Sequence, residues 1–454
     1  MFPRASLLLA IAGLLLCAPP VARAQAGVPF TVDTSGGGNA AQSRNSQTHE
    51  TRQRPLSDRL PDKPSLPPAS SIPVEPLGFS APGPIYLGVR NSLASLDFLD
   101  ENRLLFTFRV PGLIRREPGD SEASEERQIR AIVLALPEGK IEAEALWTVH
   151  DRLRYLWMLK DGHFLLRDRD GLAQGDAKLE LKPYLQFPGP LLWLELDPTE
   201  QFLVTNSREP KAAAKAGEVD SPDSARAAMV VDGQKPDEET DFVLRILRRA
   251  SGKVMLVSRT RTTIHLPINT DGYLESLRGN GQQWTLNLDS FSGESTVLGR
   301  LDSACSPVFD FVSQREVQVT ACDAEGGREL VAISTDGRRF WEVSTAATEA
   351  WPLLVRSPDG SRLAQETLVA THAISAYSPL DGEDVKGQLV RVFDAANGNV
   401  ALEAQASPVL DAGGNVAISP SGRRVAVIGA GAIQVFDLPE APKLPDAAVN
   451  QTRR

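Results

Sequence analysis

The sequence predicts an all-β fold, a seven-bladed β-propeller of four-stranded antiparallel blades, and three observations support this prediction. The chain has 454 residues, of which 42% are hydrophobic, so it can bury a large core and is not disordered throughout. Residues 84–439 contain almost no helical periodicity but many short β-rich runs separated by Gly, Pro, Asp and Ser. Turn motifs recur between these runs, and repeated four-strand units are typical of a propeller.

The N-terminal residues 1–24 are typical of a secretory signal peptide. Arg4 supplies a positive charge, an apolar stretch follows, and Ala24 ends a small-x-small cleavage site. The apolar stretch is shorter than the about 20 residues that a membrane span needs. A lipid anchor at Cys17 is the alternative, but it requires a small residue where Leu16 stands. We therefore expect export to the periplasm or the extracellular space, without lipoprotein anchoring.

Three further segments complete the predicted domain organisation. Residues 25–83 are rich in Gly, Ser and Pro and lack apolar periodicity, which predicts a disordered tether. Residues 84–439 would form the propeller, and residues 440–454 would form a polar C-terminal tail. No later stretch is long and apolar enough to predict a transmembrane segment.

Two segments show the repeat most clearly. Residues 357–364 read SPDGSRLA and residues 419–426 read SPSGRRVA, each between two apolar runs. Pro presets its φ angle and Gly tolerates a positive φ, so both segments predict tight turns between a first and a second strand. Weaker versions of this turn occur at residues 99–102, 160–162, 197–200, 270–272 and 313–315. Seven such turns predict seven blades.

A second pattern predicts the third strand of each unit. Residues 390–394 (VRVFD) lead into a turn at Gly398, and residues 244–246 lead into a similar glycine turn. The last unit ends after its third strand, at residues 432–436, so its fourth strand must come from elsewhere. We expect residues 84–90 (PIYLGVR) to supply it, because an N-terminal strand would close the ring and remove two exposed edges.

The S-P-D-G-x-R-L-A and V-x-V-F-D-x-x-x-G segments resemble those of bacterial WD-repeat-like propellers of the YVTN and TolB type. The resemblance covers about 355 residues and is clearest in the last two blades. The Trp-Asp and Gly-His pairs of true WD repeats are lacking, as is the separate N-terminal α/β domain of TolB. The resemblance implies the propeller fold and a family habit of binding partners.

The extra residues of the longer units lie in three insertions, at residues 113–129, 206–240 and 368–386. Each falls between the expected second and third strands, in blades 1, 3 and 6, so all three would project from one face of the ring. Together they hold seven more acidic than basic residues, in a chain of net charge −10. A basic partner or a divalent cation is one interpretation, and solvation of the loops is the other. The net charge argues against nucleic acid as a partner.

Cys305 and Cys322 are the two cysteines that remain once a signal peptide is removed. They lie symmetrically about the predicted turn at residues 313–315, so a hairpin would place them opposite each other. In an oxidising compartment we expect them to form a disulfide. Two buried thiols or a redox pair are the alternatives, although the spacing differs from the C-x-x-C motif of oxidoreductases.

Residues 334–341 (STDGRRFW) resemble the Asp-box of sialidase-type propellers, with Arg338 and Phe340 in place of Gly and Thr. In those families the box stabilises a turn and is distant from catalysis. The resemblance therefore implies a structural role for this segment.

Two other groups of residues are candidate metal ligands. Asp168, Asp170 and Asp176 alternate as in a calcium loop, but Leu172 occupies a ligand position and the terminal Glu is missing. The histidines that follow the tether lack the spacing of a metal set, so we interpret them as surface residues. They are His150, His163, His265 and His372.

These observations predict a monomeric, non-catalytic binding scaffold that binds a protein or a cell-envelope polymer on the face carrying the insertions. No catalytic, cofactor-binding or metal-ligating residue is predicted, because no catalytic or nucleotide-binding motif occurs. The alternative is a propeller hydrolase, lactonase-like or glycan-cleaving, with a site at the mouth of the central channel. Four or more Asp, Glu, His or Asn side chains converging there would favour the enzyme.

Overall fold

The computed structural model describes residues 56–57, 59–80, 94–111, 126–150, 154–211, 240–260, 263–375 and 380–442. These residues belong to one compact unit, residues 53–454. The predicted signal peptide (1–24), the predicted closing strand (84–90) and most of the predicted tail (440–454) lie outside the described residues.

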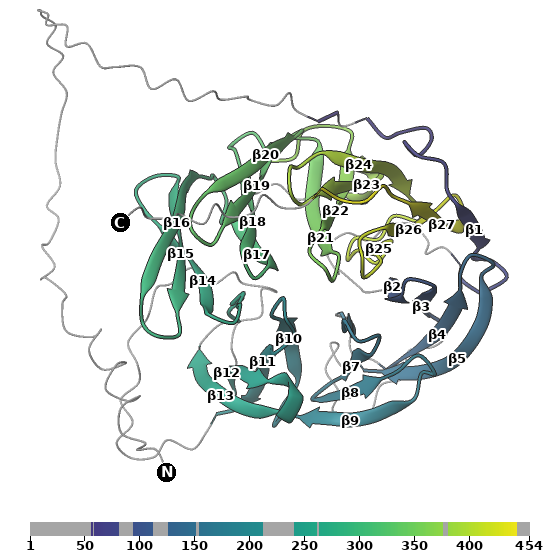
Figure 1. Ribbon diagram of the computed structural model, residues 1–454, viewed down its shortest axis with the longest axis horizontal. Coiled ribbons are helices and arrows are strands. Elements are labelled where there is room, and N and C mark those ends of the chain that lie inside the picture. Colours follow the sequence, from purple (N-terminus) through teal and green to yellow (C-terminus); the bar gives the residue numbers. More distant parts are fainter. Residues whose placement is uncertain are drawn as a thin grey trace, which may run out of the picture. The chain divides into compact units, whose positions relative to one another are not determined.

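Seven antiparallel sheets follow one another around a ring, as Figure 1 shows. Blade 1 comprises β2 (Ala94–Asp100), β3 (Arg103–Arg109), β4 (Arg127–Ala135) and β5 (Lys140–Val149); blade 2 comprises β6 (Leu156–Met158), β7 (Phe164–Asp168), β8 (Gly171–Gly175) and β9 (Leu181–Gln186). Blade 3 comprises β10 (Leu191–Leu196), β11 (Phe202–Pro210), β12 (Thr240–Arg248) and β13 (Lys253–Thr260); blade 4 comprises β14 (Gly272–Arg278), β15 (Gln283–Ser290) and β16 (Ser295–Asp302).

The remaining blades complete the ring. Blade 5 comprises β17 (Val308–Ser313), β18 (Glu316–Cys322), β19 (Arg328–Ser334) and β20 (Arg339–Thr345); blade 6 comprises β21 (Glu349–Arg356), β22 (Arg362–Ala370), β23 (Val385–Asp394) and β24 (Val400–Ala406). Blade 7 comprises β25 (Val416–Ile418), β26 (Arg424–Gly429), β27 (Ala432–Asp437) and β1 (Ser70–Pro73). Two short 3-10 helices, η2 (Arg249–Ser251) and η3 (Gly382–Asp384), lie in connections. This arrangement confirms the predicted all-β, seven-bladed propeller.

Blade 4 differs from the other blades in its first strand. Its sheet has three strands among the described residues, and an isolated bridge between Ile268 and Tyr273 stands where the innermost strand would begin. The predicted turn at residues 270–272 connects this bridge to β14. The side-chain oxygen of Asn269 accepts hydrogen bonds of 2.9 and 2.8 Å from the backbone N–H groups of Asp271 and Gly272, which fixes the turn without a full strand before it.

Six of the seven predicted turns connect a first to a second strand, and the turn of blade 4 follows the isolated bridge; hydrogen bonds explain their recurrence. In the turn between β21 and β22, the Ser357 hydroxyl donates to the Asp359 carboxylate at 2.6 Å and accepts from the Arg362 N–H at 2.9 Å. Gly360 adopts φ 74°, and Gly422 in the equivalent turn of blade 7 adopts φ 67°. Residues with a Cβ rarely adopt these angles, so the sequence signature follows from the backbone geometry.

An N-terminal strand closes the ring, but it is not the one expected from the sequence. The strand β1 pairs with β27 in antiparallel register, with Ile72 opposite Ile433, and completes blade 7. We expected residues 84–90 in this place. A four-residue strand that ends in Pro73 has little sequence signature, and a proline is tolerated there because β1 forms the outer edge of its sheet.

The segment that precedes β1 packs along the outer wall of the ring, which corrects the predicted boundary of the disordered tether (25–83). The Leu56 N–H donates to the Ser344 carbonyl of blade 5 at 3.1 Å, and the Ser65 N–H donates to the Glu403 carbonyl of blade 6 at 2.9 Å. We call residues 56–57 and 59–73 the strap; Figure 1 shows it passing outside β24 toward β1. Backbone hydrogen bonds to existing sheet edges order this proline-rich chain, although it contributes few apolar side chains.

The hydrophobic core consists of clusters between neighbouring blades. Trp147 of blade 1 packs on Phe164 of blade 2 with ring centroids 5.4 Å apart, and Trp341 of blade 5 stacks on Phe393 of blade 6 at 6.1 Å. Both tryptophans are buried, which is typical of aromatic residues that pack between blades. In the described part of the chain, no helix is long and apolar enough to cross a membrane.

Candidate functional site

Six charged side chains from six different blades lie around the axis of the ring. We call this set the axial charge cluster. It consists of Asp97 in β2, Arg154 just before β6, Glu195 in β10, His265 before the Ile268 bridge, Asp310 in β17 and Arg356 at the end of β21. The first strands of the blades face the centre of the ring in Figure 1, and this position brings residues distant in sequence together.

Strand alternation explains why these side chains point toward the axis. In β10, Leu194 and Leu196 are buried in a cluster between blades. Their neighbours Trp193 and Glu195, which point to the other face of the strand, are half-buried. The strand β2 follows the same rule, with Leu96 buried and Asp97 half-buried. Successive side chains of a strand point to opposite faces, so the pattern that buries leucine between blades directs the polar residues elsewhere.

Glu195, His265 and Asp310 form a group of two acids and one histidine, contributed by blades 3, 4 and 5. The Glu195 Oε2 and His265 Nε2 atoms are 3.1 Å apart, with side chains 13% and 20% exposed. Burial disfavours both charged forms, but the mutual attraction outweighs it, so the pKa of Glu195 is lowered and the pKa of His265 is raised. The surrounding protein, which displaces water, and the negative charge of Glu195 raise the pKa of Asp310 to about 8.

Arg356 connects blade 6 to this group of residues from blades 3, 4 and 5. Its guanidinium donates to the Leu196 carbonyl of blade 3 at 3.0 Å and to the Phe311 carbonyl of blade 5. It also lies 3.8 Å from the Asp310 carboxyl. One side chain of blade 6 thus connects three blades, and its charge opposes the rise in the Asp310 pKa.

Arg154 differs from the other members of the axial charge cluster because its side chain is exposed to solvent. Its Nε donates to the Leu156 carbonyl at 3.0 Å, and the guanidinium lies 5.3 Å from the centre of the Trp157 ring. The protein that surrounds it on several sides lowers its pKa, and Asp97 is the strongest opposing charge. The Asp97 carboxylate accepts a hydrogen bond of 2.6 Å from Ser95, but burial outweighs this bond and raises its pKa.

The axial charge cluster combines three carboxyl groups, one imidazole and two guanidinium groups. The three carboxyl groups and the imidazole lie around the axis. The sequence analysis took four such side chains as evidence for an enzyme. Two guanidinium groups, which it did not anticipate, oppose their charge. Among the described residues, no three His, Cys, Asp or Glu side chains are arranged to hold a metal ion. Two carboxyl groups whose pKa values are shifted in opposite directions can act as general acid and base.

Sequence reasoning named only His265 of these six residues, and named it as a surface histidine. A signal was nevertheless present. Glu195, Asp310 and Arg356 each lie one to three residues before a first-to-second-strand turn. An alignment of the seven turns that compares the charged positions just before them would have identified these three residues.

The predicted disulfide between Cys305 and Cys322 is confirmed. The Cα atoms of the two residues are 5.7 Å apart, and the bond ties the chain before β17 to the end of β18. The Ser303 hydroxyl beside it accepts a hydrogen bond of 3.0 Å from the Cys322 N–H. The disulfide therefore closes the hairpin of blade 5, at the end opposite its turn.

The Asp-box resemblance at residues 334–341 marks a turn between β19 and β20. The Ser334 hydroxyl accepts from the Arg338 N–H at 3.0 Å and donates to the Asp336 carboxylate, and Gly337 adopts φ 86°. The buried Trp341 indole donates to the Ala395 carbonyl of blade 6 at 2.6 Å. The segment holds a turn and links two blades, as the resemblance implied.

The carboxylates of the candidate calcium loop have other partners. Asp168 accepts hydrogen bonds of 3.1 and 2.7 Å from the backbone N–H and the Nδ1 of His150. Asp176 accepts from the backbone N–H groups of Lys178 and Glu180 at 2.9 and 3.2 Å. The structure does not bring these carboxylates together around one position. The other two histidines, His163 and His372, lie beside Asp161 and Asp384.

The three insertions lie between second and third strands, with bounds that differ slightly from the expected 113–129, 206–240 and 368–386. The connections run over residues 110–126 in blade 1, 211–239 in blade 3 and 371–384 in blade 6. The strands β11 and β22 extend further than the sequence indicated, because their ladders continue to Pro210 and Ala370. Most of the inserted residues lie outside the described chain.

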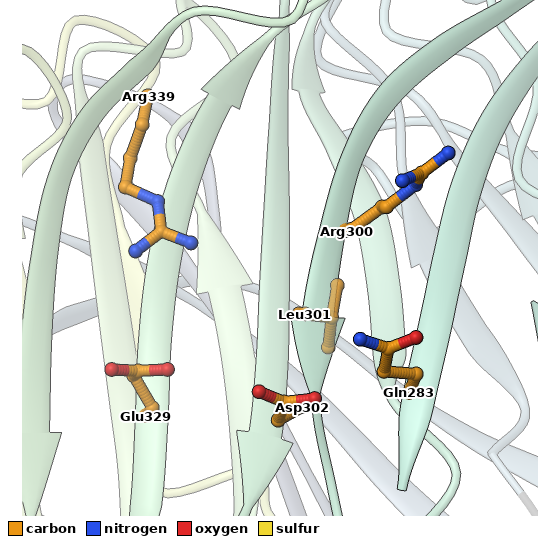
Figure 2. A pocket seen from close by; sticks show the side chains of 6 residues that line it. All are labelled: Gln283, Arg300, Leu301, Asp302, Glu329 and Arg339. Carbon is orange, nitrogen blue, oxygen red and sulfur yellow. The ribbon is translucent and has the colours of Figure 1, made fainter. Parts of the chain in front are cut away.

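A groove of about 260 Å³ lies on the outer wall between blades 4 and 5. Figure 2 shows its two guanidinium groups, from Arg300 and Arg339, at one end and its carboxylates at the other. The groove is lined by Gln283, Arg300, Leu301, Asp302, Glu329 and Arg339. It is formed by outer strands and is separate from the axial charge cluster.

No family model and no curated protein matches the chain. Among solved structures with some similarity, a Pyrococcus horikoshii acylaminoacyl peptidase is 10% identical with a TM-score of 0.43, and the match covers 79% of this chain and 53% of that one. A chain of a mitotic checkpoint complex is 9% identical with a TM-score of 0.43, covering 91% and 98%. A luciferin-regenerating enzyme is 12% identical with a TM-score of 0.36, covering 68% and 95%. The chain spans about half the length of the acylaminoacyl peptidase that it matches.

Proposed function

We propose that this chain is an exported, monomeric propeller of the WD-repeat-like, YVTN and TolB type. It acts as a non-catalytic scaffold that binds a protein or a cell-envelope polymer. The face formed by the second-to-third-strand connections of blades 1, 3 and 6 is the binding face. The observation that carries the proposal is that the three long connections join the same pair of strands in their blades. Because strands alternate in direction within a blade, such connections emerge on one side of a propeller.

The chemistry of the ring supports a scaffold. The carboxylates around the axis already have partners, since Glu195 pairs with His265 and Asp310 faces Arg356. Arg356 in addition bonds two backbone carbonyl groups, which is what a bracing residue does. These contacts favour a structural use of the axial charges.

Two features support export and the choice of partner. The disulfide between Cys305 and Cys322 is typical of proteins that fold in an oxidising compartment, and residues 1–24 read as a signal peptide. The surplus of acidic residues in the insertions favours a partner with basic groups and opposes nucleic acid.

The test compares partner sets by affinity purification from an envelope extract and mass spectrometry. One variant replaces residues 212–239 with a short Gly-Ser linker, and a second replaces residues 113–124 in the same way. Both replacements leave the flanking strands β3, β4, β11 and β12 intact. The matched control scrambles residues 212–239 at constant composition, which separates recognition of sequence from attraction of charge. We expect both linker variants to lose partners that the wild type retains, at unchanged thermal stability. Identical partner sets would overturn the proposal.

A hydrolase is the second candidate, and the opposite pKa shifts of Glu195 (lowered) and Asp310 (raised) favour it. In such an enzyme, Asp310 would act as general acid and Glu195 as general base. The variants Glu195→Gln and Asp310→Asn, assayed on a panel of lactones and glycans, test this alternative. Turnover by the wild type that both variants lose would replace the scaffold with the enzyme.

A further inference from the structure

The outer strand of blade 3 exposes an unusual run of apolar residues. Val254, Met255, Leu256 and Val257 are consecutive in β13 and are 43, 49, 40 and 54% exposed. The strand is well formed, with β12 paired along its inner side from Lys253 to Thr260. Within the part of the chain that the structure describes, no strand pairs with its outer side. An edge strand directs half of its N–H and C=O groups outward, where they can pair with another strand.

The strand β13 differs from the outer strands of the other blades because its charged residues, Lys253 and Arg259, flank an uninterrupted run of four apolar residues. The strap covers β20, β24 and β27 in blades 5, 6 and 7 through backbone hydrogen bonds. In blades 1, 2 and 4 the outer strand is interrupted by charged residues or proline, the usual means of preventing edge pairing. These residues are Glu142 and Glu144 in β5, Lys182 and Pro183 in β9, and Arg300 in β16. Neither device is present within residues 254–257.

The charges at the two ends of β13 are unequal. At its start, Lys253 pairs in register with Arg248 on β12, and both side chains are exposed. At its other end, Arg259 forms an ion pair of 3.0 Å with Asp241. The start of the strand therefore carries the positive charges of Lys253 and Arg248, whereas Asp241 balances the charge of Arg259 at its other end.

These charges discriminate among occupants of the edge. A second copy paired antiparallel about Leu256 would place Lys253 opposite Arg259, whose charge Asp241 already balances, so it would bring no carboxylate to Lys253 and Arg248. A segment that presents carboxylates to Lys253 and Arg248 would instead gain attraction at the one unbalanced end.

We propose that β13 is a strand-addition site for an extended segment of a partner protein. The segment pairs antiparallel with β13, presents apolar side chains along Val254 to Val257, and carries acidic residues at its C-terminal end, beside Lys253 and Arg248. Backbone hydrogen bonds to β13 provide the affinity for this segment. Its alternate apolar side chains and its terminal acidic residues provide the specificity. This surface is the outer wall of blade 3, so the inference goes beyond the face proposed above and does not depend on it.

The probe is a synthetic ten-residue peptide of alternating threonine and valine with two C-terminal aspartates. Three comparison peptides each differ from it in one feature. The first ends in two lysines, the second carries the two aspartates at its N-terminus, and the third has N-methyl groups on alternate backbone amides. Binding is measured by fluorescence anisotropy with the full chain, and the bound strand is located by hydrogen–deuterium exchange. We expect the first peptide to protect the amides of residues 253–260 and to bind about tenfold more tightly than each comparison peptide.

Two substitutions make the test specific. Val257→Lys should weaken the first peptide about tenfold, whereas Leu146→Lys on β5, where the side chain is 61% exposed, should not. Lys253→Glu should reverse the preference so that the lysine peptide binds more tightly. Circular dichroism melting shows that each variant folds. Equal binding of the N-methylated peptide, protection outside β13, or a dimer of the chain that Val257→Lys abolishes would each overturn the proposal.

Discussion

Arg356, at the end of β21, donates a hydrogen bond of 3.0 Å to the carbonyl of Leu196 in β10, although 160 residues separate them. The same guanidinium bonds the Phe311 carbonyl and faces the Asp310 carboxyl. Blades 3, 5 and 6 are therefore connected across the axis as well as around the ring. Each blade of a propeller packs mainly on its neighbours, so a contact of this kind couples blades that sequence order separates.

Substitution of this side chain should weaken the whole ring. Arg356→Ala leaves two backbone carbonyls without their donor and removes the cation that faces Asp310, so we expect a loss of about 1–3 kcal/mol in the free energy of unfolding. Denaturant unfolding of the full chain measures it. Arg300→Ala on the outer wall is the control and should cost far less. A smaller loss for Arg356→Ala than for the control would contradict the bracing role.

Glu316 in β18 gives the stability of the protein a distinct dependence on pH. It is fully buried, and burial raises its pKa to about 8. A carboxyl whose pKa is higher in the folded than in the unfolded chain stabilises the fold when protonated, and stability is lost as pH rises from about 4.5 to about 8. Glu316→Gln mimics the protonated form. It should leave stability at pH 5 nearly unchanged and raise it at pH 8 by about 1–3 kcal/mol.

Chemical denaturation of both proteins at the two pH values measures this effect. Glu142→Gln on the exposed face of β5 is the matched control, because water solvates that carboxylate in both states. A parallel pH dependence of wild type and Glu316→Gln would show that the carboxyl titrates as it does in the unfolded chain.

The raised pKa of His265 should give the stability of the protein a pH dependence of the same sign. The pKa of His265 is raised because attraction to Glu195 outweighs burial. Its contribution to stability is therefore full below the unfolded pKa of about 6.5 and is lost as pH rises through the folded value. Glu195→Gln should lower the His265 pKa. Titration of the imidazole by NMR checks this, and an unchanged midpoint would refute the pairing.

Loss of the disulfide should destabilise blade 5. The bond closes a loop with a sequence separation of 17 residues. In the chain-entropy model, closing a loop of this size contributes about 3 kcal/mol. The double variant Cys305→Ser/Cys322→Ser should unfold at correspondingly lower denaturant concentration, and reductant should shift the wild type but leave this variant unaffected. A reductant effect on the variant would point to another cause.

Truncation should distinguish the strap from the chain that precedes it. A chain that starts at Gln53 retains the strap and β1, and we expect it to melt like the wild type. A chain that starts at Glu75 lacks β1 and leaves the edge of β27 unpaired, so its melting temperature should fall markedly. Thermal melts of both chains measure the difference. Equal melting temperatures would show that β1 does not close the ring.

The strand pattern and the turns of the ring were predictable because they depend on local chemistry. Ser357, Asp359 and Gly360 specify their turn through hydrogen bonds and a positive φ within five residues. Such signals can be read along the chain, and seven of them determined the number of blades. The spacing of Cys305 and Cys322 about such a turn predicted their disulfide for the same reason.

Tertiary structure alone decided which distant residues meet. The strand β1 has one strongly apolar side chain, Ile72, and becomes a strand only because the edge of β27 is open to pair with it. The axial charge cluster likewise exists because ring closure places β10, β17 and β21 around one axis, where Glu195, Asp310 and Arg356 meet. Hydrogen bonds within a turn are local and leave a sequence signature, whereas pairing and charge balance across a ring depend on closure.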